Sequence, residues 1–181
     1  MTKEVHQLDD IISIFNQCFS EEFNTRLVKG GDEPLYSPAN EERPYHAIYF
    51  ARGFYSSALH EIAHWLIAGK ERRLLEDFGY WYEPDGRSEE RQREFEKVEV
   101  KPQATEWILA QAAGHRFFAS SDNLNGNAGD TSPFKRAVYE QVKTYIANGL
   151  PPRTAKLREA LCEFYGTDKT LDIANFDVTR I

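Results

Sequence analysis

The segment HEIAH at residues 60–64 constrains the fold of this chain more than any other stretch. It matches the pattern H-E-x-x-H, in which four residues of helix bring two imidazoles onto one face, where both can bind one metal ion. The flanking apolar residues recur at helical spacing and independently predict the helix that the pattern requires: Leu59, Ile62, Ala63 and Leu66. Gly69 is placed to end this helix. We therefore expect a metal site here, with His60 and His64 as ligands, rather than two hydrogen-bonded core histidines.

Two histidines leave a divalent ion under-coordinated, so a third protein ligand is expected from elsewhere in the fold. None of the other histidines is well placed in the sequence for this role: His6, His46 and His115. A carboxylate is the better candidate, and Glu99 stands between two valines, where a charged group needs a reason to be present. Glu106 is the rival, because gluzincin peptidases place a helical Glu downstream of their H-E-x-x-H. Either residue could instead be an ordinary solvated side chain or part of a salt bridge.

The identity of the metal and the role of Glu61 depend on each other. Two histidines with one carboxylate form the facial triad of non-haem iron oxygenases, but a two-His-one-Glu set also holds catalytic zinc. In a zinc peptidase, Glu61 would be the general base that takes a proton from the metal-bound water. In an oxygenase, it would support the ligands instead. The residues alone favour neither role.

At 181 residues, the chain is long enough for one domain with a hydrophobic core, so we expect a single domain over residues 1–181. Its patterns predict an α+β fold in which a small sheet packs with several helices. Besides the HEIAH helix, the expected elements are a helix starting near Asp9, two short strands within 24–36 around the turn GGDEP, a strand at 46–52, a helix opened by Pro102 and ended by Gly114, and helices at about 133–148 and 152–165. Residues 168–181 are expected to form a loosely held tail.

The composition restricts the partners and the compartment. A formal net charge of −7 argues against non-specific binding to nucleic acid, which needs clustered Lys and Arg. Cys18 and Cys162 show no C-x-x-C spacing, so neither a disulfide framework nor a thiolate zinc site is indicated. No apolar stretch reaches the roughly 18 residues that a membrane span needs, and the N-terminus lacks an apolar signal region. We expect a cytoplasmic protein without a nucleic-acid or membrane partner.

Several segments resemble the elongation factor P hydroxylase family, a small bacterial family. The resemblance extends from about Phe15 to Gly166, and only the tail looks unrelated. The segments that carry it are FNTRL (23–27), GDEPLY (31–36), GFYSSALHEIAHW (53–65), AGKERR (68–73), DFGYWYEPDGR (77–87) and VEVKPQA (98–104).

The resemblance implies a fold, an activity and a ligand set. The fold would be similar to a zincin-like endoribonuclease of rRNA maturation. The activity would be hydroxylation of the lysine side chain of elongation factor P after a β-lysyl group has been attached to it. The metal ligands would be His60, His64 and Glu99, holding Fe(II), with dioxygen as co-substrate.

A cationic substrate of this kind directs attention to acidic and aromatic side chains. Four acidic residues could steer it or be ordinary surface charge: Asp32, Glu33, Asp77 and Glu83. An aromatic cluster precedes the turn dipeptide at 85–86 and consists of Phe78, Tyr80, Trp81 and Tyr82. Such a cluster is more often a core or lid element, but beside the metal it could cradle an alkyl-ammonium chain by cation–π contact.

Three other functions stay open on the sequence. The first is a zinc metallopeptidase that uses Glu61 as its general base. The second is a metal-dependent endoribonuclease, suggested only by analogy of fold. The third is a non-catalytic binding module with a structural metal, which would show four protein ligands and no open position.

Overall fold

The computed structural model describes residues 5–77, 88–120 and 130–181. Over these residues the chain is rich in helix and carries a small three-stranded sheet, which confirms the α+β class. The elements in chain order are α1 (Leu8–Phe19), β1 (Thr25–Lys29), β2 (Leu35–Ser37), β3 (His46–Phe50), α2 (Tyr55–Ile67), the short 3₁₀ helix η1 (Arg72–Leu74), α3 (Glu89–Ala113), α4 (Ser132–Asn148), α5 (Pro152–Tyr165), and the 3₁₀ helices η2 (Ile173–Asn175) and η3 (Val178–Arg180).

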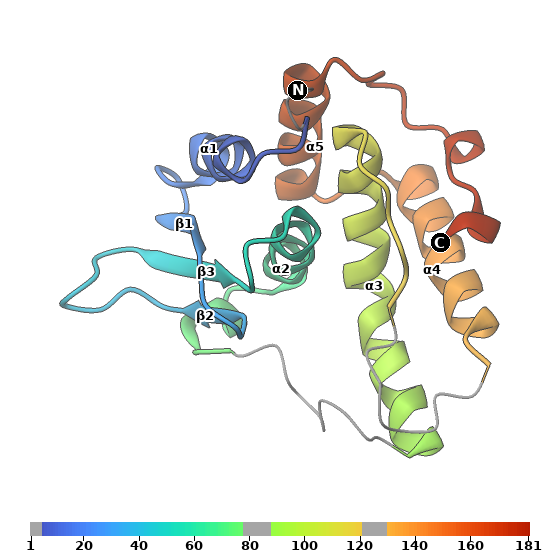
Figure 1. The fold of residues 1–181 in the computed structure, drawn as a ribbon, viewed down its shortest axis with the longest axis horizontal. Helices are drawn as coiled ribbons and strands as arrows, with labels where there is room; N and C mark the ends of the chain where they lie inside the picture. The colour runs from blue at the N-terminus through green and yellow to red at the C-terminus, as the bar shows by residue number, and fades with distance from the viewer. Residues whose placement is uncertain (1–4, 78–87, 121–129) are drawn as a thin grey trace.

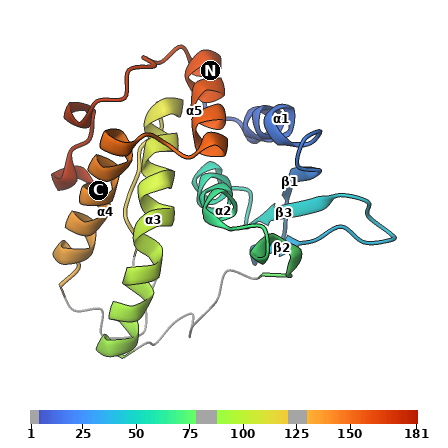
Figure 2. The same cartoon turned by 180° about the vertical axis from the view of Figure 1, so that it is seen from behind.

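Helix α2 lies at the centre of the arrangement, with β3 on one side and α3 on the other (Figure 1). Seen from behind, α3, α4 and α5 gather on one side of α2, and the sheet with α1 lies on the other side (Figure 2). The buried apolar side chains of the described residues join in a cluster to which α1 to α5 all contribute. A helix in this position must bury most of its surface, which is why α2 is largely apolar except on the face that carries His60 and His64.

The sheet has the strand order β1-β3-β2, so the two strands around the GGDEP turn do not pair with each other. Instead, β3 inserts between them, parallel to β1 and antiparallel to β2. Ile48 at the middle of β3 is opposite Leu27 of β1 and Tyr36 of β2. The central strand is buried at Ala47, Ile48 and Phe50, and it contacts α2.

The expectation that Pro102 opens a helix is wrong, because α3 runs without interruption from Glu89 to Ala113 and Pro102 lies inside it. Ser88 caps the N-terminus, where its Oγ accepts a hydrogen bond from the backbone N–H of Arg91. The first half of α3 buries one face that is largely polar, and this hides the amphipathic pattern: Gln92, Phe95, Glu96, Glu99 and Gln103. The predicted end of the helix is confirmed, since Gly114 adopts the left-handed conformation with φ of 66°.

Gly69 is not the residue that ends α2. The helix stops at Ile67, and Ala68 already has extended backbone angles. The guanidinium of Arg153 on α5 donates hydrogen bonds to the carbonyls of Trp65, Leu66 and Ala68 at 3.0–3.1 Å. These bonds satisfy the last carbonyls of the helix, so no left-handed glycine is needed there.

The end of the chain is packed more closely than a loose tail. Phe176 is buried and meets the ring of Trp107 edge-on, with 5.2 Å between the ring centroids. The last residue, Ile181, is also buried. Thr167 Oγ1 donates to the carbonyl of Ala112 at 2.6 Å, which ties the start of this segment to α3. The apolar residues of 168–181 follow neither a helical nor a strand period, so the sequence did not predict this packing.

The remaining helices agree with the sequence. Helix α1 covers the expected apolar residues, α4 starts one residue before Pro133, and α5 coincides with the predicted range. No helix among the described residues combines the length and apolar character that crossing a bilayer demands.

Candidate metal centre

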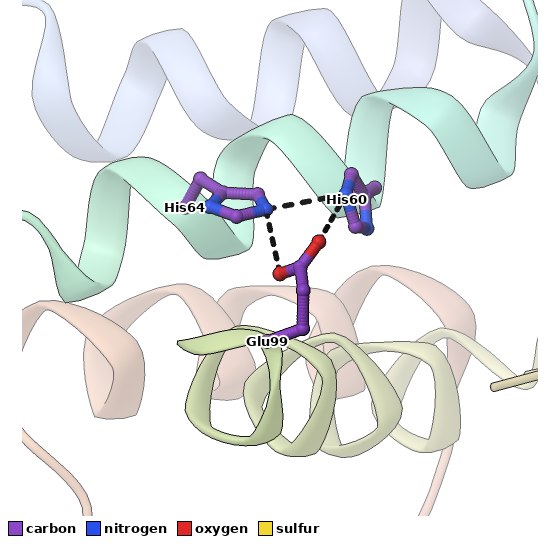
Figure 3. Close-up of side chains that lie close together, drawn as sticks. All are labelled: His60, His64 and Glu99. Atoms are coloured by element: carbon purple, nitrogen blue, oxygen red, sulfur yellow. Dashed lines mark hydrogen bonds and ion pairs between the residues drawn. The ribbon is translucent and has the colours of Figure 1, made fainter. Parts of the chain in front are cut away.

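His60 and His64 on α2 point toward Glu99 on α3, and the three side chains meet between the two helices (Figure 3). His64 Nε2 lies 3.1 Å from Glu99 Oε2, and His60 Nε2 lies 3.7 Å from Glu99 Oε1. The two imidazole Nε2 atoms are 3.2 Å apart. One candidate ligand atom from each residue lies within 4.8 Å of the other two. The structure therefore brings together the three residues that the sequence indicated.

The local fold explains why these side chains converge. The opposite face of α2 is held in the core by four buried residues: Leu59, Ile62, Ala63 and Leu66. With that face fixed, positions 60 and 64 are turned toward α3. Glu99 is 4% exposed, and a buried carboxylate needs a cation or hydrogen-bond donors. Two imidazoles and one carboxylate at this spacing are a donor set that fits a divalent transition metal, whose bonds to such ligands are about 2 Å long.

Glu106, the rival third ligand, lies on the other side of His60. Its Oε1 is 2.7 Å from Nδ1 of His60. Because an ionised carboxylate can only accept, Nδ1 carries a proton, which leaves Nε2 as the nitrogen that can bind a metal on the side of Glu99 and His64. This is the arrangement by which carboxylates orient metal-binding histidines. The sequence placed Glu106 near the metal but did not indicate this orienting contact.

The carboxylates dominate the electrostatics of the site. Burial alone would lower the pKa of His60, but the charge and hydrogen bond of Glu106, with further contributions from Glu99 and Glu61, raise that pKa well above its ordinary value. Burial raises the pKa of Glu61, and the Glu99 and Glu106 carboxylates add to this while the two imidazoles oppose it. Three carboxylates facing two imidazoles favour the binding of a cation.

Two cavities flank the site. The first has a volume of about 180 Å³, and its lining includes Tyr36, Ile48, His64, Trp65, Arg73 and Pro102. The second has a volume of about 530 Å³, and its lining includes Ser57, His60, Glu106, His115, Arg116 and Phe118. Glu61 lines both cavities. The ligand face of α2 is thus accessible from two sides.

The other histidines have structural partners of their own and are not part of the ligand group. His6 Nε2 lies 2.6 Å from the carbonyl of Ala113, and His115 Nδ1 lies 2.9 Å from the carbonyl of Arg116. His46 Nδ1 accepts a hydrogen bond from the backbone of the loop before β3.

The acidic and aromatic candidates for substrate contact divide into three groups. Asp32 and Glu33 are exposed in the connection between β1 and β2. Asp77 lines the first cavity and forms an ion pair with Arg72 at 3.2 Å. Glu83 and the aromatic cluster at 78–82 lie outside the described residues.

The fold and the site together define a helix-rich α+β protein with a candidate two-histidine, one-carboxylate metal centre. Residues 14–176 match the family described as elongation factor P hydroxylase, and the chain belongs to that family. It is similar to a protein of Haemophilus influenzae named elongation factor P lysine hydroxylase, with 77% identity over 176 residues that cover 97% of this chain and 99% of the relative. The resemblance in the sequence is confirmed, and the match extends beyond Gly166 into the segment that looked unrelated.

Proposed function

We propose that this protein hydroxylates the β-lysylated lysine side chain of elongation factor P, using dioxygen at a non-haem iron centre. Membership of the hydroxylase family and the name of the Haemophilus relative support the reaction and the protein substrate. The observation that carries the proposal is the convergence of His60, His64 and Glu99, because this ligand set is typical of dioxygen-activating iron sites.

In this proposal, Nε2 of His60, Nε2 of His64 and the carboxylate of Glu99 hold Fe(II). When bound, iron would supply the activation of dioxygen: one oxygen atom would enter a C–H bond, and the other would leave as water with two electrons and two protons supplied by a reductant and the solvent. Three protein ligands leave further coordination positions open, which a purely structural four-ligand site would not.

The surrounding residues prepare the ligands for this chemistry. Glu106 keeps the proton of His60 on Nδ1, so that Nε2 is available without a rearrangement of the ring. The burial of Glu99 limits the competition of water for its carboxylate. Glu61 faces both cavities and is placed to contact a substrate that enters either of them.

A zinc metallopeptidase remains the second candidate. The part-buried Glu61 carboxylate has a raised pKa and lies beside His60 and His64, as a general base for a metal-bound water would. In that case, the metal-loaded protein would cleave peptides, and the variant Glu61→Gln would not. Peptide cleavage of this kind, without hydroxylation, would favour the peptidase over our proposal.

Intact-mass spectrometry of the substrate protein tests the hydroxylase. The enzyme is loaded with Fe(II) under anaerobic conditions, mixed with β-lysylated elongation factor P and ascorbate, and exposed to air. We expect a mass gain of one oxygen atom that is lost in His60→Ala, His64→Ala and Glu99→Ala. Glu94→Ala is the matched control, since Glu94 lies on the same helix but is exposed and pairs with Arg91. Absence of the gain with the wild-type protein would overturn the proposal.

A further inference from the structure

Glu61 lies between the two cavities that flank the candidate metal site. It is shared by the linings of the first and second cavities, and no other described residue is. It lies one position after His60 on α2, yet its carboxylate makes no hydrogen bond or ion pair with any residue that the structure describes. The side chain is only part-exposed, so water compensates its charge incompletely.

The other two carboxylates of the site already have partners. Glu99 contacts both imidazoles, and Glu106 accepts a hydrogen bond from Nδ1 of His60. Once a divalent ion is bound by the triad, Glu61 is the one carboxylate of the three that has no hydrogen bond or ion pair with a described residue. A part-buried carboxylate in this state is best satisfied by a positive group that enters from outside.

The two cavities differ in what they can accept. The second cavity is larger, at about 530 Å³, and the 60% exposed ring of Phe118 lies in its lining, so a long side chain can enter there. The first cavity is smaller, at about 180 Å³, and its lining includes Arg73 and the ion pair of Arg72 with Asp77. Its smaller volume leaves less room than the second cavity for a long side chain that reaches Glu61.

We propose that Glu61 recognises the substrate by binding an ammonium group of the modified lysine side chain, which enters through the second cavity. This inference rests on the proposed function, because it assigns the cation to the substrate of the hydroxylase. Glu61 thereby makes the enzyme specific for a side chain that carries a free amine. Pairing the ammonium at this point holds the neighbouring methylene carbons beside the triad, where the hydroxylation takes place.

Binding measured without turnover tests this role. The Fe(II)-loaded enzyme is titrated under anaerobic conditions with a peptide that carries a β-lysylated lysine, and with the same peptide after acetylation of both β-lysyl amines. For the free-amine peptide, we expect Glu61→Gln to weaken binding by roughly tenfold or more, as expected when one partner of a desolvated ion pair is neutralised. The acetylated peptide should bind weakly and equally to the wild type and the variant.

Two controls separate recognition from general damage. Glu94→Gln neutralises an exposed carboxylate on α3, outside both cavity linings, that already pairs with Arg91, and it should leave binding of the free-amine peptide unchanged. The iron content of Glu61→Gln should equal that of the wild type.

Two results would contradict the inference. Equal affinity of wild type and Glu61→Gln for the free-amine peptide, with only kcat lowered, would place Glu61 in the chemical step. An equal loss of affinity for both peptides would show that recognition does not depend on the ammonium group. If the wild type hydroxylates the β-lysylated protein, either of these results would overturn this inference alone. A wild type that neither binds nor hydroxylates the substrate would overturn the proposed function as well.

Discussion

Glu106 Oε1 lies 2.7 Å from Nδ1 of His60, on the side of the imidazole that faces away from Glu99. This contact fixes which nitrogen of His60 is available to a metal. It would also make His60 a stronger metal ligand, since a carboxylate on the far nitrogen increases the basicity of the ring. The two glutamates that competed for one role in the sequence thus occupy two distinct positions around one histidine.

The first prediction concerns this contact. Glu106→Leu removes the acceptor from His60 Nδ1, so metal affinity should fall by roughly 10- to 100-fold. Glu106→Gln keeps an acceptor oxygen but loses the charge, and its affinity should lie between those of the wild type and Glu106→Leu. Titration of each apoprotein with Co(II), followed by its absorption spectrum, measures the affinities. Unchanged affinity in Glu106→Leu would contradict the orienting role, and a complete loss matched by normal binding in Glu99→Ala would make Glu106 the third ligand.

The second prediction concerns removal of the metal. An ion that binds only the folded chain stabilises it by RT ln(1 + [metal]/Kd), or about 2.7 kcal/mol at a free metal concentration of about 100 Kd. A chelator should therefore lower the Tm of the wild type. It should have no effect on Glu99→Ala or His64→Ala, because these variants lack a complete ligand set. Differential scanning calorimetry with and without the chelator measures this. A wild-type Tm that does not respond to metal would argue against the triad.

Much of the site was predictable because its ligands follow strong local rules. The four-residue spacing of His60 and His64 and the apolar residues around them predict a helix with a ligand face, and the structure has that helix. Glu99 could be proposed from its position between two valines, although the reason for its burial is different. It lies on a largely polar buried face of α3, which no apolar periodicity marks.

The two wrong predictions of helix ends, at Pro102 and Gly69, have the same cause: tertiary contacts override the local sequence signals. Pro102 usually marks the start of a helix, but here α3 continues through it because Gln92, Phe95 and Glu96 already pack one turn after another before it. Gly69 usually marks a helix end, but Arg153, 88 residues from Trp65 in sequence, satisfies the carbonyls instead. Contacts between such distant residues leave no trace in a sequence window.

The third prediction tests this cap on the metal-site helix. Arg153→Met removes three hydrogen bonds to the last carbonyls of α2 and a cation from the negative end of the helix dipole, so we expect a loss of about 2 kcal/mol in the free energy of unfolding. Arg153→Lys should recover only part of this, since an ammonium cannot reproduce the planar fork. Urea titration of the apoproteins measures the difference.

Arg158→Met is the matched control for this prediction. Arg158 lies on the same helix α5 and is also part-exposed, but it donates a single, solvent-exposed hydrogen bond, to the carbonyl of Lys169. We expect its replacement to cost less than about 0.5 kcal/mol. If Arg153→Met is no more destabilising than Arg158→Met, the cap does not contribute to the stability of α2.

The fourth prediction concerns acidification and His46, away from the metal ligands. His46 Nδ1 accepts a hydrogen bond of 2.9 Å from the backbone N–H of Ala39, which requires that nitrogen to be unprotonated. Burial, followed by the positive charges of Arg43 and Arg73, lowers the pKa of His46 below its ordinary value. The unfolded chain therefore takes up a proton at His46 at a higher pH than the folded chain does, and the free energy of unfolding must fall as the pH drops below about 6.5.

His46→Asn isolates this effect, because the asparagine Oδ1 can accept the same hydrogen bond but does not titrate. Urea unfolding of both apoproteins at about pH 7.5 and about pH 5.5 compares them, with His60 and His64 common to both. The wild type should lose more stability than His46→Asn between the two conditions. If the free energy of unfolding falls by the same amount in both proteins, His46 is protonated equally readily in the folded and unfolded chains. Its hydrogen bond to Ala39 would then not contribute to the pH dependence of stability.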